Sequence, residues 1–197
     1  MTRIIAGSAR GRRMAVPPAG TRPTPDRVRE ALMSSLESRL GGLLGVRVLD
    51  LYAGSGAIGL EAASRGAGAV TLVEHDRQAL AVLRSNVDAV GVGEVRVAAS
   101  DVVRWLSTPC PDPASAYEVV FLDPPYDLPA VEVGRVLTML GDGGWLTDQA
   151  TVVVERPRRE IGWIWPLGYE PERERRYGET VLRSALWYRR RDDESGE

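Results

Sequence analysis

Two short segments of the sequence combine glycines, acids and prolines in patterns that are typical of ligand-binding and catalytic loops. The first is a glycine pattern, G-x-G-x-x-G, at Gly54, Gly56 and Gly59, directly after an apolar run. Such glycines let the backbone approach a ligand at the start of a helix. Glu74 follows Gly54 by twenty residues, where an acid accepts hydrogen bonds from ribose hydroxyls. The spacing predicts a site for an adenosine-containing cofactor, and a tight turn without a ligand is the alternative.

Two cofactors fit this loop, a nicotinamide dinucleotide and S-adenosylmethionine. A dinucleotide brings a pyrophosphate, which favours a helix N-terminus without nearby acids. Asp50 stands four residues before Gly54, where its carboxylate repels a pyrophosphate but pairs with the ammonium or sulfonium of S-adenosylmethionine. The chain has no lysine and one histidine, His75, which we expect at the rim of the site. These features favour S-adenosylmethionine.

A further acid follows the third apolar run. Asp101 is suited to accept a hydrogen bond from the adenine amino group, while the N–H of Val102 is suited to a ring nitrogen. Asp101 is equally suited to be the N-cap of a short helix, and the two roles are compatible. The full set of predicted cofactor-binding residues is Asp50, Ala53, Gly54, Ser55, Gly56, Glu74, His75, Ser100, Asp101 and Val102.

The second chemical segment is Asp123-Pro124-Pro125-Tyr126, after a fourth apolar run. Two prolines fix the backbone and remove two N–H donors, which leaves the Asp123 carboxylate and the Pro124 carbonyl as acceptors. They can take both hydrogens of an exocyclic amino group, so that its lone pair turns toward an electrophilic methyl. Tyr126 offers a face for a base that has left its helix. These four residues are the predicted catalytic loop, without metal or covalent intermediate; a strand-ending Asp-Pro turn is the alternative.

These segments need a fold that brings several strand ends together. Apolar runs lie at 46–52, 69–74, 95–99, 119–122 and 151–155, and helical patterns lie between them at 57–65, 77–90, 101–106 and 128–140. This alternation predicts βαβ units and a mostly parallel sheet covered on both faces. Residues 169–176 and 179–189 predict a terminal antiparallel hairpin. The expected fold class is therefore α/β.

The net charge of −2 hides an uneven distribution. Residues 1–47 hold 9 arginines against 3 acids, whereas residues 48–150 hold 6 against 14. We expect the basic segment to form a small hairpin, and then a helix with Thr24 as N-cap and Pro25 as its first residue. Its charge predicts contact with RNA phosphates. The predicted RNA-binding residues are Arg10, Arg12, Arg13, Arg22, Arg27 and Arg29, and the group at Arg156, Arg158 and Arg159 is a further candidate flanked by acids.

Composition excludes several other classes of protein. Apolar residues make up 44% and charged residues 26%, which is typical of a globular domain. The sequence contains no apolar run long enough for a membrane span and no N-terminal signal pattern. The single cysteine, Cys110, cannot form an internal disulfide. We expect a cytoplasmic monomer with an extension at 1–45, a catalytic domain at 46–190 and a charged tail at 191–197.

The motifs together resemble the RsmD-type 16S rRNA guanine-N2 methyltransferases of bacteria. The resemblance runs through 3–7, 11–12, 22–30, 49–50 and 59–62 to the loop at 123–126. It implies a seven-stranded Rossmann-like methyltransferase fold with an N-terminal extension, and S-adenosylmethionine as cofactor. It also implies methylation of one guanine in the small ribosomal subunit RNA, on a 30S subunit or an assembly intermediate.

Two other functions are weighed against this one. An N6-adenine methyltransferase of nucleic acid would use the same catalytic loop, but the chain is short for a separate target-recognition domain. A non-catalytic RNA-binding assembly factor would keep the basic segment and a vestigial cofactor site. Binding of S-adenosylmethionine and transfer of its methyl group distinguish the three.

Overall fold

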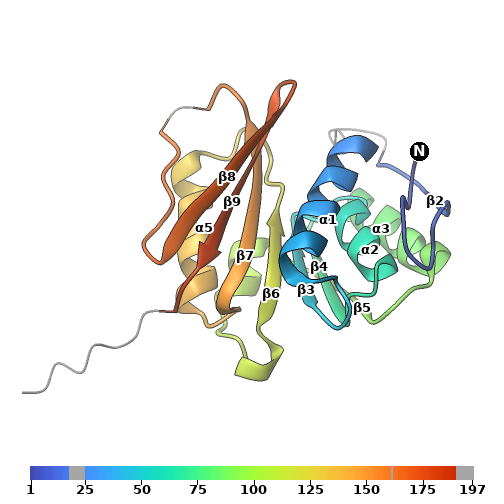
Figure 1. Cartoon of the computed structure of the whole chain (residues 1–197), viewed down its shortest axis with the longest axis horizontal. Coiled ribbons are helices and arrows are strands. Elements are labelled where there is room, and N and C mark those ends of the chain that lie inside the picture. The colour runs from blue at the N-terminus through green and yellow to red at the C-terminus, as the bar shows by residue number, and fades with distance from the viewer. Residues whose placement is uncertain (18–24, 161, 190–197) are drawn as a thin grey trace, which may run out of the picture.

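A computed structural model describes residues 1–17, 25–160 and 162–189. Its main element is a seven-stranded sheet in the order β5-β4-β3-β6-β7-β9-β8 (Figure 1). Strands β3 to β7 are parallel to one another, and β9 is antiparallel to both β7 and β8. The predicted α/β fold with a terminal hairpin is confirmed. The strands are β3 (Arg47–Leu51), β4 (Ala69–Glu74), β5 (Val95–Ala99), β6 (Tyr117–Leu122), β7 (Leu146–Pro157), β8 (Tyr169–Tyr177) and β9 (Thr180–Trp187).

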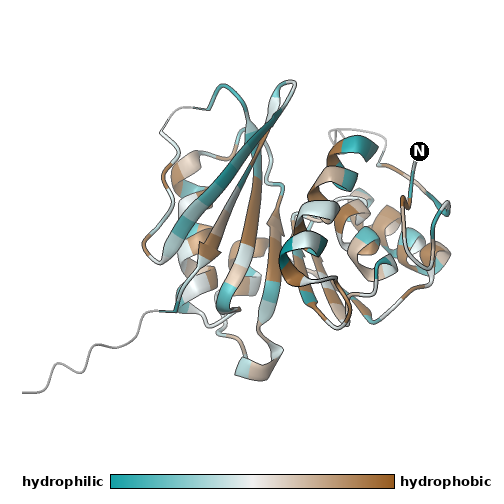
Figure 2. Ribbon diagram, in the orientation of Figure 1, coloured by the Kyte–Doolittle hydropathy of each residue, from teal (hydrophilic) through white to brown (hydrophobic). Residues whose placement is uncertain are grey.

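Helices cover both faces of this sheet because its strands are apolar on both sides. On β6, Val119 and Phe121 pack in one buried cluster, and Val120 and Leu122 pack in the other. Figure 2 shows apolar stretches along β7, in contrast to the edge strand β8, which is largely hydrophilic. Buried residues of α1, α2 and α3 belong to the first cluster and those of α4 and α5 to the second. The helices are α1 (Asp26–Leu40), α2 (Ala57–Ser64), α3 (Arg77–Val90), α4 (Val102–Leu106), the 3-10 turn η1 (Pro113–Ser115) and α5 (Ala130–Asp142).

The predicted element boundaries are corrected at two prolines. Helix α5 begins after Pro129 rather than at Leu128, because a proline disfavours helical backbone at the residue before it. Pro25 is likewise the N-cap of α1, with ψ of 145°, and not its first helical residue. Thr24, the predicted N-cap, lies outside the described residues. None of the described helices has the length and apolar character of a membrane span.

Strand β7 is longer than the predicted run at 151–155. It extends from Leu146 to Pro157, because Leu146 pairs with Tyr117 at its start and Pro157 pairs with Thr180 at its end. Residues 146–149 lack an apolar pattern, so strand pairing rather than local sequence extends the strand there. The extension at the other end brings Arg156 into the sheet.

The N-terminal segment forms the predicted hairpin and is fixed to the first helix layer. Strands β1 (Thr2–Arg3) and β2 (Arg13–Met14) pair antiparallel. The backbone N–H groups of Ile5 and Ala6 donate to the Glu61 carboxylate of α2, at 2.8 and 3.0 Å. Asn86 of α3 binds both the N–H and the carbonyl of Ala15, at 2.8 and 3.0 Å. The segment is therefore attached to the two helices that follow the glycine loop and Glu74.

Candidate active site

The predicted chemical residues meet at the carboxyl edge of the parallel strands. In sheets of this kind, ligands bind at that edge. Strand register brings Leu51 opposite both Val73 and Leu122, and Glu74 opposite Ala99. The segments that directly follow β3, β4, β5 and β6 therefore share one edge. Four acids from four strands lie at or just beyond these ends, namely Asp50, Glu74, Asp101 and Asp123.

The glycine loop turns from β3 into α2. Gly56 is the N-cap of α2 and has a φ of 78°, a left-handed conformation that favours glycine. Gly59 faces β4 so closely that a Cβ atom on it would lie 2.3 Å from Leu72 Cδ2. The third glycine thus lets the helix approach the strand. Ala53 and Ser55, which are buried, complete the predicted loop together with Gly54.

Asp50 is a buried acid beneath this loop. Its side chain is 3% exposed, and it accepts a hydrogen bond from the Gly59 N–H at 3.0 Å. Burial is the main reason that the pKa of Asp50 is raised to about 7; the Gly59 hydrogen bond acts in the opposite direction, and the nearby charge of Glu74 adds a smaller increase. A carboxyl group in this state gains its charge when a cation binds beside it.

Glu74 holds the glycine loop as well as standing where a ribose is expected. Its carboxylate accepts hydrogen bonds from the N–H groups of Gly54 at 2.9 Å, His75 at 2.7 Å and Asp76 at 2.7 Å. A carboxylate has about four acceptor positions, so these three hydrogen bonds leave one position for a predicted ribose hydroxyl. The His75 ring is 59% exposed and 3.6 Å from the Glu74 carboxylate. It lies at the rim, as the sequence predicts.

Asp101 is the N-cap of α4 in the structure. Its carboxylate accepts a hydrogen bond from the Arg104 N–H at 3.0 Å, and the residue is exposed. The Ser100 hydroxyl donates to the Asp101 carbonyl at 3.1 Å. Val102 is buried beneath them. The capping role is confirmed. The adenine contact remains a prediction, for which the second carboxylate oxygen of Asp101 is available.

The catalytic loop begins directly after β6. The Asp123 N–H donates to the Leu51 carbonyl at 3.3 Å, which links this loop to the strand that carries Asp50. Burial raises the pKa of Asp123 well above its usual range, and the charges of Glu155 and Asp50 raise it further while Arg156 lowers it. Pro124 is buried and Pro125 is exposed. Tyr126 is 52% exposed, and its hydroxyl lies 3.2 Å from the Thr180 hydroxyl of the terminal hairpin.

A support behind this loop was not foreseen from the sequence. Arg156 is 2% exposed, so its place in a surface group with Arg158 and Arg159 was wrong. Its guanidinium donates to the Leu128 carbonyl at 2.6 Å and to the Pro125 carbonyl at 3.4 Å. Its Nε donates to Glu160 at 2.8 Å. Arg156 therefore fixes the backbone that follows Asp123.

The predicted RNA-binding arginines divide into two groups. Arg10, Arg12, Arg13 and Arg27 are exposed, and Arg12 also donates to the Val90 carbonyl at the end of α3. Arg29 is fully buried and donates to the Arg3 carbonyl at 2.6 Å and to Asp26 at 3.0 Å. This burial removes Arg29 from the predicted RNA-binding set. Arg22 lies outside the described residues.

Comparison with known proteins identifies the family. A family model described as Conserved hypothetical protein 95 matches residues 2–186. The chain belongs to this family. The chain is also similar to curated relatives named ribosomal RNA small subunit methyltransferase D. The one from Escherichia coli K12 is 36% identical over 194 residues, covering 98% of this chain and 92% of the relative. The one from Haemophilus influenzae is 35% identical over 156 residues, covering 78% and 77%.

Solved structures agree with this membership of the Conserved hypothetical protein 95 family. The Escherichia coli protein yhhF has a TM-score of 0.82 at 35% identity, covering 96% of this chain and 99% of that one. A hypothetical protein from Thermus thermophilus has a TM-score of 0.76 at 36% identity, covering 93% and 98%. A magnesium protoporphyrin IX methyltransferase from Synechocystis, at 15% identity and a TM-score of 0.62, shares the fold. The resemblance drawn from the motifs is confirmed.

Proposed function

We propose that this protein transfers a methyl group from S-adenosylmethionine to the exocyclic N2 amine of a guanine in the small ribosomal subunit RNA. The observation that carries the proposal is the placement of the Asp123 and Pro124 acceptors at the same sheet edge as the glycine loop, Asp50 and Glu74. The relatives named ribosomal RNA small subunit methyltransferase D support the choice of substrate. The protein would act as a cytoplasmic monomer on the 30S subunit or an assembly intermediate.

The residues of the site fit S-adenosylmethionine. The left-handed turn at Gly56 brings the loop backbone to the start of α2 at the sheet edge, and Glu74 stands at the position of a ribose acceptor. Asp50 is a buried carboxyl that a cationic group would stabilise in its charged form. The cofactor supplies an electrophilic methyl group when it is bound. A pyrophosphate would meet the Asp50 carboxyl instead, which disfavours a dinucleotide.

The catalytic loop provides hydrogen-bond acceptors, a group that can take a proton, and an aromatic ring on which a base can stack. The Asp123 carboxylate and the Pro124 carbonyl accept the two hydrogens of the guanine amine and hold its lone pair toward the methyl group. Their interactions are strengthened because Pro124 is buried and Asp123 is partly buried. The methylated nitrogen must then lose one proton, and the raised pKa of Asp123 suits its carboxylate to take it. The exposed ring of Tyr126 is placed to stack on a flipped base.

Transfer of labelled methyl groups tests this proposal directly. We would supply labelled S-adenosylmethionine with 30S particles, protein-free 16S rRNA or duplex DNA, and map the modified base. The expected result is label on one guanine of the rRNA. Label on adenine in DNA would favour the N6-adenine alternative. Absence of cofactor binding by calorimetry would favour a non-catalytic assembly factor.

The affinity for S-adenosylmethionine should depend on pH through Asp50. Because the pKa of Asp50 is raised to about 7, the carboxyl is largely protonated below that pH and must lose its proton when a cation binds. Affinity should therefore fall as pH falls below 7, by at most about tenfold per pH unit. Calorimetric titrations between pH 5.5 and 7.5 measure this. Asp50→Asn should bind weakly and lose the dependence; an unchanged slope in this variant would assign the titration to another group.

Arg156 should affect turnover more than cofactor binding. Replacement with methionine removes the donors to the Pro125 and Leu128 carbonyls, so the loop that carries Asp123 loses its support. We expect kcat for methyl transfer to fall about 10-fold to 100-fold, since small misplacements of reacting groups are costly. The dissociation constant for the cofactor should stay near the wild-type value. Arg156→Lys, which keeps the charge but not the fork of donors, should recover only part of kcat. Equal losses in cofactor affinity and turnover would contradict this role.

A further inference from the structure

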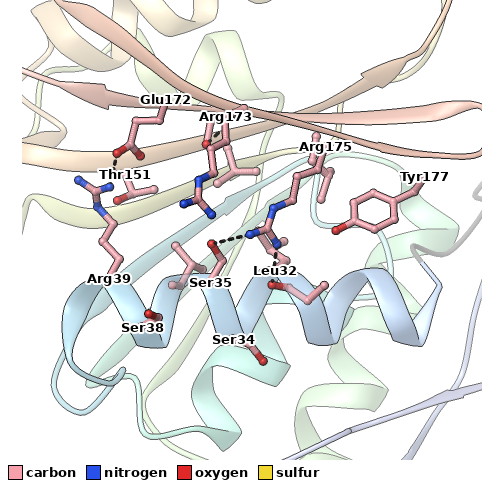
Figure 3. A pocket seen from close by; sticks show the side chains of 15 residues that line it. Leu32, Ser34, Ser35, Ser38, Arg39, Thr151, Glu172, Arg173, Arg175 and Tyr177 are labelled. Atoms are coloured by element: carbon pink, nitrogen blue, oxygen red, sulfur yellow. Dashed lines mark hydrogen bonds and ion pairs between the residues drawn. The ribbon is translucent and has the colours of Figure 1, made fainter.

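A groove with both apolar and charged lining residues lies between α1 and the terminal hairpin, outside the residues assigned to the active site. Its volume is about 640 Å³, within the size range of sites for small organic ligands. Figure 3 shows Arg173, Arg175 and Tyr177 of β8 along one wall of the groove, facing helix α1. The α1 wall is rich in small hydroxyl side chains, namely Ser34, Ser35 and Ser38.

The charge of the groove is predominantly positive. Three arginines line it, against the single acid Glu172, which is paired with Arg39. Within the described part of the chain, Arg173 and Arg175 form no ion pair. Arg175 donates to the Ala31 carbonyl at 3.4 Å and to the Ser35 hydroxyl at 3.5 Å, both long for hydrogen bonds. These two guanidinium groups are therefore suited to hold an anion with fork-like geometry, such as a phosphate.

One end of the groove adjoins the catalytic loop. Tyr177 pairs with Thr180 at the tip of the hairpin, and the Thr180 hydroxyl lies 3.2 Å from the Tyr126 hydroxyl. A base stacked on Tyr126 is covalently joined to its neighbours, which must leave the site along an adjacent surface. The groove begins at this point and offers first an aromatic ring, then two arginines along the same strand.

We propose that the groove binds the single-stranded nucleotides next to the target guanine. A phosphate would lie against Arg173 and Arg175, and a neighbouring base would lie against Tyr177. This inference rests on the proposed function, because it takes the occupant of the catalytic loop to be an RNA base. Continuity with Tyr126 favours RNA over an acidic protein segment, for which a groove next to the catalytic loop would have no purpose.

The test compares two double variants of the full-length protein. Arg173→Gln/Arg175→Gln removes the groove cations, and Arg96→Gln/Arg135→Gln removes two exposed arginines from β5 and α5 as a matched control. We would measure binding of a single-stranded RNA that contains the methylated guanine and its flanking nucleotides, over a range of salt concentrations. The groove variant should bind at least 10-fold more weakly. The slope of log K against log salt should become shallower by about 0.7, for the one phosphate that both arginines contact.

Further measurements separate this inference from the proposed function. With the groove variant, KM for RNA should rise while kcat at saturating RNA, the cofactor affinity and the thermal midpoint stay near wild type. Tyr177→Leu should weaken RNA binding roughly 5-fold to 150-fold, the range measured for lost base stacking. If wild type transfers methyl to rRNA and both double variants bind alike, the groove proposal alone fails. If wild type transfers none but the groove variant still loses RNA binding, the proposed function alone fails.

Binding of an acidic peptide tests whether the groove holds a protein segment instead of RNA. A fluorescent oligoglutamate would be titrated into wild type and the groove variant under the same salt conditions. We expect weak binding that is similar in both proteins. Tight binding to wild type that disappears in the groove variant, with RNA binding unchanged, would assign the groove to a protein partner and overturn the proposal.

Discussion

Replacement of Asp123 with alanine should nearly abolish methyl transfer while cofactor binding is retained. The variant loses the carboxylate that accepts an amine hydrogen and the group that takes the released proton. Loss of one preorganised polar group in a buried site costs about 10²–10³ in kcat, and loss of a general base costs about 10²–10⁴. Single-turnover transfer to 30S particles measures the loss, and calorimetry measures the affinity for S-adenosylmethionine. Turnover within tenfold of wild type would contradict the assignment of Asp123.

Asp123→Asn separates the two roles. An asparagine carbonyl still accepts a hydrogen bond, but the amide does not take a proton at these pH values. Because the pKa of Asp123 is raised, wild-type kcat should fall as pH decreases through that raised value, since only the carboxylate form accepts. The asparagine variant should keep measurable activity, above that of the alanine variant, and lose this acid limb. A wild-type rate that is flat toward low pH would contradict the proton-accepting role.

The residues that do chemistry could be predicted because their constraints are local. The glycine spacing reports a turn and a close helix–strand contact, and the structure shows both at Gly56 and Gly59. The prolines after Asp123 fix the backbone whatever else surrounds them. Alternation of apolar runs with helical patterns was sufficient for the parallel sheet. Such patterns involve a few adjacent residues, so they can be recognised without knowledge of contacts between distant parts of the chain.

The roles of the buried arginines could not be predicted in the same way. Arg29 and Arg156 lie in segments rich in exposed charge, where arginine usually faces water. Each is buried by partners far away in sequence: Arg29 by Arg3 and Glu61, and Arg156 by Leu128. The one available clue was position. If strand pairing continues beyond residue 155, Arg156 lies in the sheet. Arg29 directly follows Val28, which begins the apolar i, i+4 series with Leu32 and Leu36 on the buried side of α1.

Glu61 should prove one of the most sensitive positions for stability. It is fully buried, and its carboxylate accepts from Ile5, Ala6 and the Nε of Arg65, the last at 2.9 Å. It also lies 3.8 Å from the Nε of Arg29, which is fully buried as well. Glu61→Ala leaves a buried cation without this partner and two N–H groups without acceptors. We expect the free energy of unfolding to fall by about 3–5 kcal/mol, measured by urea denaturation. The exposed pair of Glu132 and Arg135 gives the control, because Glu132→Ala should cost less than about 1 kcal/mol.

A double-mutant cycle makes the origin of this loss measurable, even if the alanine variant is only marginally folded. Glu61→Leu alone leaves Arg29 buried beside an apolar side chain, whereas Glu61→Leu with Arg29→Met removes both charges. The double variant should therefore be more stable than Glu61→Leu, since a buried pair costs little when replaced by apolar groups of similar size. A double variant as unstable as the sum of its singles would show that the two charges act independently. Because Glu61 also holds Ile5 and Ala6, we expect Glu61→Leu to release the basic hairpin and weaken RNA binding, with Arg29→Met restoring stability but not that binding.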